Sequence, residues 1–395
     1  MRVLVELFDR DAIKNVLGAC AFTPEIVVFL CDTHDATFFK ESAIYRLFKR
    51  RKMKTMPRFY YFDATDPDEI RMVLAAVVRD YPGCVFDFSG GSDLVLLLAG
   101  VGFAKGAMPG YYIDMAGGRL IDLRGCAGLA EAFRMPVFSA EDIFVMTGAT
   151  IQGHGHFPQQ EMDDGHEWDV LTVFEMVAES PRAWGSFVAW LQAFCAAGPA
   201  KALELEGPRL VRAGESPLHA NTALLRRLHA AGMLESLEIG HGQVRLRFKS
   251  LWHRKCLLIE GIWLELFCYV AARRSGFFDD VRTSIVVDWD GVEGGNDNTK
   301  NEVDVFLLRG ITPVFVSCKM SVPTALAMSE IKLLSVRFGG GMSRAVLLTA
   351  AALGDEHKAM KARAAELGIT FLDRSACTLE QLGKALGAIA EGHRK

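Results

Sequence analysis

The residues best suited to chemistry lie in one stretch of the last third of the chain, residues 301–319. Two strand-like runs flank Gly310 and Ile311, and a tight turn centred there would pair the runs as an antiparallel hairpin. Directly opposed residues of such a hairpin share a face, so Asp304 would lie opposite Ser317. The same register places Glu302 opposite Lys319. The other face would receive an apolar set: Val303, Val305, Leu307, Val316 and Cys318.

Two carboxylates and a lysine on one face suit the hydrolysis of a phosphodiester. That reaction needs a divalent cation to polarise the phosphate and acidify a water, and a positive charge near the developing negative charge. Carboxylate oxygens favour a hard ion such as Mg²⁺ or Mn²⁺ over zinc. A plain surface ion pair between Glu302 and Lys319 accounts for the same pattern equally well on local grounds.

The hairpin resembles the core of the PD-(D/E)XK nucleases. Asp304 matches the motif aspartate, and Ser317-Cys318-Lys319 occupies the (D/E)-X-K triplet with serine at the acidic position. Upstream, residues 260–265 resemble the Gly-x-Trp-Leu-Glu helix of one branch of that superfamily, in which the final glutamate, here Glu265, approaches the metal. The resemblance implies Lys319, Asp304 and Glu265 as catalytic residues, and Asp304, Glu302, Glu265 and Ser317 around the metal. Glu330 is a further source of the missing carboxylate.

Other acidic groups are rival metal ligands. Asp288 and Asp290 share a strand face, but their spacing supplies no lysine. The polar stretch 149–170 holds a second set: His154, His156, Asp163, Asp164 and His166. A linker of this composition rarely holds preorganised ligands.

A glycine-rich turn lies in the first third of the chain. Residues 87–93 follow a strand and open a helix, so the backbone N–H groups around Gly90 and Gly91 could hold a phosphate. A tight turn with Ser92 as helix cap explains the turn equally well. The G-x-G-x-x-G fingerprint of dinucleotide binding is missing after the first strand, where residues 9–12 contain no glycine.

This turn resembles the Asn-x-Thr-Gly-Gly-Thr-Lys motif of CARF domains, with Ser89, Gly90, Gly91 and Ser92 as the matches and Asp93 in place of the lysine. CARF domains bind cyclic oligoadenylates across the two-fold axis of a homodimer. The resemblance implies ligand contacts from three loops: Phe8, Asp9, Arg10, Thr33, His34, Ser89, Gly90, Gly91, Ser92 and Asp93. Arg10 is equally well explained as a solvated surface cation.

The elements that must position these residues form three segments. Residues 1–148 alternate strands (3–8, 25–30, 58–62, 84–87 and 111–115) with helical runs, which predicts a mostly parallel, Rossmann-like sheet. Residues 149–250 combine a polar linker with helices and a hairpin over 236–249, typical of a winged-helix unit. Residues 251–395 predict a helix over 257–273, three strands, a helix and a strand, a compact α/β domain. The fold class is therefore α/β throughout.

Composition narrows the function classes. The chain has 395 residues, half of them hydrophobic, and a net charge of −4, so any nucleic-acid contact must be local. Nine scattered cysteines form no C-x-x-C pair, which argues against zinc. The longest strongly apolar stretch is far short of the roughly 20 residues that span a bilayer. We expect a cytoplasmic protein without a membrane partner.

In this order the three segments resemble the CRISPR-associated ancillary nucleases that cyclic tetra-adenylate activates. The resemblance implies a homodimeric nuclease that acts on DNA or RNA. The main alternative is a CARF-controlled regulator that binds nucleic acid through the winged helix, around Arg226, Arg227 and His229, with an inactive nuclease fold. A small-molecule α/β enzyme is a third reading, but it lacks a cofactor fingerprint.

Overall fold

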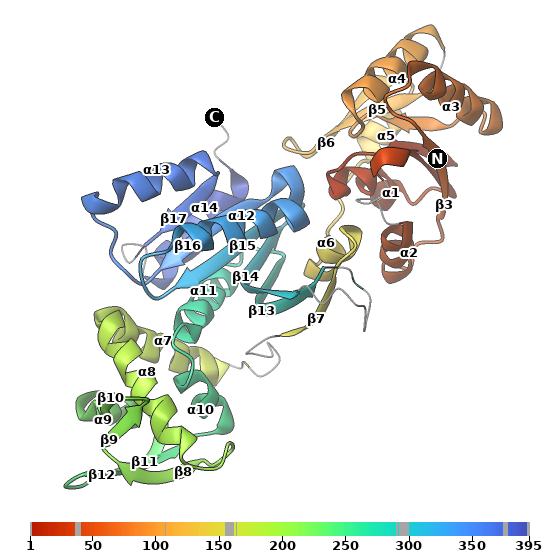
Figure 1. The fold of residues 1–395 in the computed structure, drawn as a ribbon. Helices are drawn as coiled ribbons and strands as arrows, with labels where there is room; N and C mark the ends of the chain where they lie inside the picture. The colour runs from red at the N-terminus through yellow and green to blue at the C-terminus, as the bar shows by residue number, and fades with distance from the viewer. Residues whose placement is uncertain are drawn as a thin grey trace.

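The computed structural model describes residues 2–35, 41–106, 108–154, 162, 164–289, 291, 300–373 and 378–392. Two six-stranded sheets dominate the chain, and a smaller unit of helices and antiparallel strands lies beside the second sheet (Figure 1). The expected α/β fold class is confirmed. In the part of the chain described, no helix is long and apolar enough to cross a membrane.

The N-terminal sheet has the strand order β3-β2-β1-β4-β5-β6. Its strands are β1 (Val3–Leu7), β2 (Ile26–Asp32), β3 (Met56–Phe62), β4 (Val85–Asp87), β5 (Gly110–Asp114) and β6 (Arg119–Arg124). The five expected strands are present and pair in parallel, and β6 is an additional antiparallel edge strand. The helices are α1 (Leu17–Phe22), α2 (Glu41–Arg50), α3 (Pro67–Asp80) and α4 (Asp93–Lys105). The strand order reverses between β1 and β4, where open α/β sheets form a crevice.

The middle unit begins with α7 (Asp164–Glu179) and α8 (Pro181–Ala196). It continues through β8 (Glu204–Pro208), β9 (Leu210–Ala213), β10 (Ser216–His219), α9 (Thr222–Ala230), β11 (Leu234–Ile239) and β12 (Gln243–Phe248). The expected helix and hairpin are both present, and β8 joins the hairpin as a third strand. Phe174 of α7 stacks on Phe267 of α11 (Ile262–Ser275) with ring centroids 3.8 Å apart, so the middle unit packs directly on that helix.

The C-terminal sheet has the order β17-β16-β15-β14-β13-β7. Its strands are β7 (Thr150–His154), β13 (Asp280–Asp288), β14 (Lys300–Arg309), β15 (Thr312–Lys319), β16 (Arg344–Thr349) and β17 (Ile369–Leu372). Its helices besides α11 are α12 (Ala325–Gly339), α13 (Lys358–Glu366) and α14 (Leu379–Glu391). The expected single helix over 257–273 is wrong: α10 (Leu251–Leu257) ends first, and α11 starts anew after Gly261.

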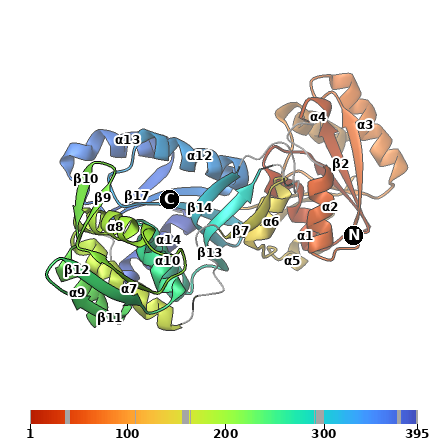
Figure 2. The same ribbon diagram turned by 60° about the horizontal axis from the view of Figure 1, so that its bottom comes forward.

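The chain passes from the first sheet to the second through two short helices, and the second sheet begins with β7. The helices α5 (Ala127–Ala132) and α6 (Ala140–Met146) follow β6, and Phe144 of α6 packs against Phe306, Phe315 and Phe338 of the C-terminal unit. β7 pairs with β13, although its polar, glycine-containing sequence reads as a linker. Both views show α6 between the two sheets and β7 at the edge of the C-terminal sheet (Figures 1 and 2). We propose that the first domain ends at residue 148, just before β7.

Candidate active site and ligand loops

The strands β14 and β15 form the expected hairpin in the expected register. Val305 lies opposite Val316, as a turn centred on residues 310 and 311 requires. Gly310 closes that turn with a φ of 59°, a left-handed conformation that glycine adopts at little cost. Among the described strand pairs, the ladder ends at Val305 and Val316, so neither of the two expected pairs, Asp304 with Ser317 and Glu302 with Lys319, belongs to it.

Asp304 is the centre of the polar contacts in this hairpin. Its Oδ2 atom accepts a hydrogen bond from the backbone N–H of Cys318 at 2.7 Å and another from the hydroxyl of Ser317 at 3.2 Å. The Nζ atom of Lys319 stands 3.8 Å from the same oxygen, and the Lys319 side chain is 38% exposed. Asp304, Ser317 and Lys319 are thus brought together. The serine orients the aspartate and adds no negative charge.

Glu265 reaches the same place from α11, which packs against β13, β14 and β15. The hydroxyl of Ser284 donates a hydrogen bond to its Oε2 atom at 3.4 Å. Burial raises the pKa of the Glu265 carboxyl well above its ordinary value, the charges of Asp304 and Glu302 raise it further, and Lys319 lowers it. Three carboxylates within electrostatic reach of one another repel, and a cation bound between them would relieve that repulsion.

Ser284 distorts β13 at the level of Asp304. Its φ of 51° is left-handed, a costly conformation for a residue other than glycine. Val281, before it, packs in one core cluster, whereas Ile285, after it, packs in the other. Backbone strain of this kind persists where the surrounding structure imposes it, often at functional sites. Here it accompanies the hydrogen bond to Glu265.

At the same level, the side chains of β14 stop alternating regularly between the two faces of the sheet, so the expectation of one apolar face is partly wrong. Four of the apolar residues expected on one face do pack together with α11: Val305, Leu307, Val316 and Cys318. Val303 instead packs in the other cluster, with Ile285 and Phe306. The left-handed residue on the neighbouring strand interrupts the alternation of period two, and the sequence pattern gave no sign of this interruption.

The donor set fits a hard divalent cation. The carboxylates of Glu265 and Asp304 lie within electrostatic reach of each other, and carboxylate oxygens are the donors that Mg²⁺ and Mn²⁺ prefer. Glu302 is exposed at the start of β14, and its charge acts on Glu265. Ser317 contributes a neutral hydroxyl. These four residues remain the candidates that the sequence predicts around a metal ion.

The rival acidic residues lie elsewhere. Asp288 is buried and accepts a hydrogen bond from Gln152 of β7. It stands four residues along β13 from Ser284, about 13 Å in an extended strand. Glu330 is exposed on α12. Asp290, His156 and Asp163 lie outside the described residues, as do the side chains of His154 and Asp164, whereas His166 packs on Trp252.

The loops that follow β1 and β4 meet where the strand order reverses. Asp9 joins them, because its Oδ2 atom accepts hydrogen bonds from the N–H of Gly91 at 3.3 Å and from Lys14 at 2.9 Å. Gly90 is needed for the close approach, since a Cβ atom there would stand 2.9 Å from the carbonyl oxygen of Leu7. This crevice is where ligands bind in open α/β sheets.

The predicted ligand residues of the β4 loop differ in exposure. Ser89 is buried: its hydroxyl donates to Asp87 and accepts from the N–H of Ile113 at 2.8 Å, so it anchors the loop. Ser92 is the N-cap of α4, but its side chain makes no capping hydrogen bond. Ser92 and Asp93 are both exposed beside the N-terminus of that helix.

The remaining predicted ligand residues belong to the loops after β1 and β2. Arg10, Thr33 and His34 are exposed, and Phe8 is partly buried. The His34 ring lies 3.5 Å from Asp63, and within the described ranges Asp32, His34 and Asp63 are the one group of three such residues compact enough to hold a metal ion. Exposed acidic groups of this kind are common without a metal, and this one lies in the N-terminal unit.

The loop after β1 also touches the C-terminal unit. The Oδ2 atom of Asp11 accepts a hydrogen bond from the N–H of Gly341 at 3.0 Å, just after α12. A cavity of about 60 Å³ lies between the units, lined by Ile143, Ile311 and Phe338 among others. The predicted ligand residues Asp9 and Arg10 are therefore immediate chain neighbours of an interdomain contact.

Gly340→Ala tests this contact. Gly340 has a φ of 60° and a ψ of −154°, a conformation nearly confined to glycine, and a methyl group there would also collide with the Asp11 carboxylate. We expect the variant to lose more stability in thermal unfolding than Gly232→Ala, its matched control. Gly232 has a φ of 75° with nothing within 4 Å, so its substitution carries only the left-handed cost of about 1 kcal/mol. Equal losses for the two variants would show that the Asp11 contact contributes nothing.

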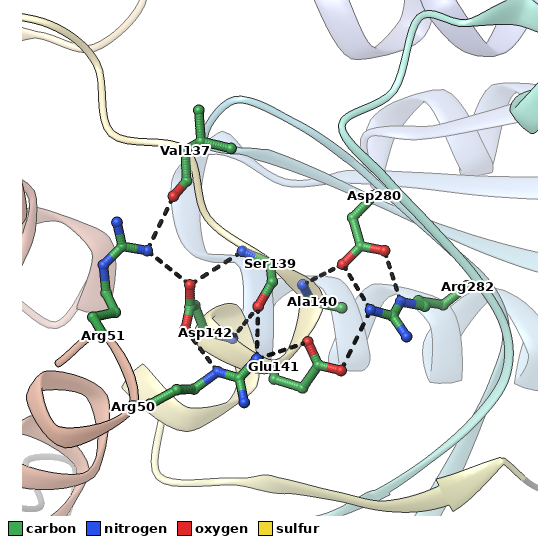
Figure 3. Close-up of polar contacts among 9 residues, drawn as sticks. All are labelled: Arg50, Arg51, Val137, Ser139, Ala140, Glu141, Asp142, Asp280 and Arg282. Carbon is green, nitrogen blue, oxygen red and sulfur yellow. Dashed lines mark hydrogen bonds and ion pairs between the residues drawn. The ribbon is translucent and has the colours of Figure 1, made fainter.

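Salt bridges join α2 to α6 (Figure 3). Arg50, the last residue of α2, and the following Arg51 hold the buried Asp142 carboxylate at 2.9 and 2.8 Å. Asp142 also closes the capping box of α6 with Ser139, and Arg51 reaches the carbonyl of Val137 at 3.0 Å. The start of α6 is thus fixed to the N-terminal unit by charge and by capping.

The same helix start is tied to β13 (Figure 3). The N–H of Ala140 donates to Asp280 at 2.9 Å, and Asp280 binds Arg282 at 2.6 Å. Arg282 also lies 3.5 Å from Glu141. Since Arg282 is two residues before Ser284, this network links α2 to the strand that contacts Glu265.

Three arginines of the middle unit form ion pairs, whereas Arg226 and His229 of α9 are exposed. Arg227 of α9 forms a two-pronged pair with Glu179, at 2.7 and 2.8 Å. On β12, Arg245 and Arg247 both pair with Glu204, at 3.0 and 3.6 Å. Paired cations offer little free positive charge to a nucleic-acid backbone.

No family model matches the sequence, and no curated protein matches it. Two solved structures share its fold over nearly the whole chain. Protein VC1899 from Vibrio cholerae superposes with a TM-score of 0.72 at 17% identity, and the alignment covers 99% of each chain. Can2 from Sulfobacillus thermosulfidooxidans, solved in complex with cyclic tetra-adenylate, superposes with a TM-score of 0.68 at 17% identity, covering 97% of this chain and 99% of Can2. The resemblance inferred from the sequence is confirmed at the level of the fold.

Proposed function

We propose that this protein is a nuclease of type III CRISPR antiviral defence that a cyclic oligoadenylate activates and that uses Mg²⁺ or Mn²⁺ to cleave DNA or RNA. The main support for the proposal is that Asp304, Lys319 and Glu265 lie within electrostatic reach of one another beside β13, which Ser284 distorts. The shared fold with Can2, whose structure contains cyclic tetra-adenylate, supports the choice of activator.

The side chains divide the work of phosphodiester cleavage. Glu265, Asp304 and Glu302 would hold a divalent ion, which would polarise the phosphate and acidify a water. Lys319, 3.8 Å from Asp304, would stabilise the negative charge that develops on the phosphate. Ser317 and the Cys318 N–H fix the orientation of Asp304. No carboxylate is therefore needed at position 317 to aim the aspartate.

The activator would bind at the crevice formed by the loops after β1, β2 and β4. The N-terminus of α4, with the exposed hydroxyl of Ser92, suits a phosphate. Asp93 places a negative charge at that point, so the positive charge must come from elsewhere, and Arg10 on the neighbouring loop can supply it. Cyclic tetra-adenylate is the first ligand to test.

A homodimer would bring two such crevices together. α4 leaves an apolar face without cover, with Leu97 63% and Val101 44% exposed. The two positions are four residues apart, so they lie on one face of the helix. Because α4 begins directly after the ligand loop, pairing of two α4 faces would place both loops beside one two-fold axis.

Leu97→Asp tests the dimer. We expect the unmodified protein to sediment as a dimer at micromolar concentration and the variant to sediment as a monomer, because a carboxylate cannot be buried unpaired in an apolar interface. Met72→Asp is the matched control, since Met72 on α3 is 64% exposed and should tolerate the charge. A dimer that survives Leu97→Asp would rule out α4 as the interface.

Control of cleavage would run through the two contacts between the units. The loop after β1 carries Asp11 to Gly341, and α2 reaches β13 through Asp142 and Asp280. A ligand that binds the crevice more tightly in one arrangement of these contacts shifts the population toward that arrangement. The change would reach the nuclease site through β13, because Ser284 of that strand donates a hydrogen bond to Glu265.

The test is a cleavage assay with three substrates: single-stranded RNA, single-stranded DNA and supercoiled plasmid. Each is incubated with and without Mg²⁺ or Mn²⁺, and with and without cyclic tetra-adenylate or cyclic hexa-adenylate. The proposal requires cleavage of at least one substrate that depends on both metal and activator. Activator-dependent retention of intact DNA would instead support the regulator. The paired state of Arg227, Arg245 and Arg247 argues against that outcome.

A further inference from the structure

Three polar side chains lie side by side inside the N-terminal sheet. Glu6 of β1 pairs with Asp87 of β4, and Asp87 pairs with Tyr111 of β5, so three neighbouring strands carry them. Each of the three residues is at most 1% exposed. Two ionised carboxylates in such a position would be very unfavourable without a counter-charge.

Helix α1 covers this group with a glycine. A Cβ atom on Gly18 would stand 2.5 Å from the Tyr111 hydroxyl, 2.7 Å from Oδ2 of Asp87 and 3.0 Å from Oε1 of Glu6. The three oxygens therefore converge on one point. Among the described residues, none of the three oxygens has a hydrogen-bond partner of good geometry, although the Tyr111 hydroxyl lies close enough to Asp87 to lower the pKa of that carboxyl.

The surroundings supply no compensating charge. Within the described ranges, neither carboxylate forms an ion pair with a lysine, arginine or histidine. Cys20 of α1, itself influenced by Arg51 and Asp142, faces Glu6, and Cys126 ahead of α5 faces Tyr111. These two cysteines are neutral at ordinary pH, because burial raises the pKa of both thiols.

The two carboxyls differ in their partners. Burial raises the pKa of Glu6 well above its ordinary value, and the charge of Asp87 raises it further. Burial also raises the pKa of Asp87, to about 6, although the hydrogen bonds from Ser89 and the neighbouring Tyr111 hydroxyl lower it. Like charges side by side cannot both ionise easily, so the proton belongs on the residue with fewer donors, Glu6.

We propose that Glu6 and Asp87 hold one proton between them, and that protonated Glu6 donates it to Asp87 as a hydrogen bond that fixes the ligand loop after β4. The Asp87 carboxylate accepts from the N–H of Ser89 at 2.8 Å and from its hydroxyl, and that hydroxyl accepts from Ile113. Glu6 is thus a positioning residue for the loop. The proton sharing stands by itself, whereas its consequence for ligand binding rests on the proposed function.

The first experiment needs no ligand. Because the folded protein holds this proton more tightly than the unfolded chain, its contribution to stability is present at low pH and lost as pH rises through the raised pKa. Glu6→Gln keeps an N–H donor at every pH. We expect the melting temperature of Glu6→Gln, relative to the unmodified protein, to be higher at about pH 8.5 than at about pH 5.5, by about 3 °C or more.

Glu25→Gln is the matched control, since Glu25 is exposed beside Arg2 and should show no such pH-dependent difference. A Glu6→Gln variant whose melting temperature runs parallel to that of the unmodified protein at all pH values would overturn the shared proton.

The second experiment measures binding of cyclic tetra-adenylate by calorimetry. Glu6→Gln should bind within a few-fold of the unmodified protein, because its amide replaces the donor to Asp87. Ser89→Ala, which removes the anchor of the loop, should bind about tenfold more weakly. A folded Glu6→Gln that binds as weakly as Ser89→Ala would overturn the role of the donor. If the unmodified protein binds no cyclic oligoadenylate, the proposed function fails, and the pH comparison alone decides the shared proton.

Discussion

Lys319→Ala is expected to slow activated cleavage by about 100- to 1000-fold, because the variant lacks the cation that stabilises the charge developing on the phosphate. The lysine side chain is partly exposed and forms one long contact, with Asp304 at 3.8 Å, so the fold should survive its removal. The measurement is the single-turnover cleavage rate at saturating metal and activator. Metal and activator binding should be nearly unchanged, which separates this effect from misfolding.

Lys300→Ala is the matched control for this loss. Lys300 is an exposed lysine on the same strand as Asp304, at its start, and has no part in the proposed chemistry. It should cleave at the unmodified rate. If Lys319→Ala retains more than a tenth of the activity, the lysine has no part in catalysis. Its contact with Asp304 is then an ordinary cross-strand ion pair.

Asp142→Ala is expected to lower the free energy of unfolding by about 2 to 3 kcal/mol, because it removes a buried carboxylate that two arginines share and half of a capping box, although Arg50 keeps its ion pair with Glu141. The carboxylate is 5% exposed and binds Arg50 and Arg51 at 2.9 and 2.8 Å. Since α6 also holds Asp280 of β13, activator-dependent cleavage should fall further than stability alone explains. Chemical denaturation and the ratio of activated to basal cleavage measure the two effects.

Asp68→Ala is the control for this change. Asp68 forms an ion pair with Arg71 at the surface, with its side chain 85% exposed, and exposed pairs of this kind contribute little. Its loss should leave both unfolding and activation unchanged. If Asp142→Ala is destabilised but is activated as strongly as the unmodified protein, the salt-bridge network is structural and the signal passes elsewhere, with the Asp11 contact as the next candidate.

The hairpin and the strand pattern of the N-terminal sheet could be predicted because both follow from short-range rules. A turn glycine fixes the register of β14 and β15, and a register fixes which side chains meet. These two rules were sufficient to predict that Asp304 lies beside Ser317. The approach of Glu265 came from resemblance, since no short-range rule places a helix residue against a strand nearly forty residues later.

The features that escaped prediction depend on long-range packing. Glu6 and Asp87 look like ordinary polar ends of strands until the parallel register sets them side by side under Gly18. The sequence of β7 resembles a linker, and only its pairing with β13 makes it a strand. Ser284 has no special neighbour in sequence, so its left-handed backbone, and the change of faces that follows, could be seen only in three dimensions.

The central claim is that the carboxylates of Glu265 and Asp304 bind one divalent ion beside Lys319. Anomalous diffraction from crystals grown with Mn²⁺ tests it most directly, because the signal locates the ion without reference to activity. We predict one manganese peak between these two carboxylates, lost in Asp304→Asn. The claim would be contradicted if saturating Mn²⁺ gave no anomalous peak between these two carboxylates. It would also be contradicted if manganese bound instead at Asp32, His34 and Asp63.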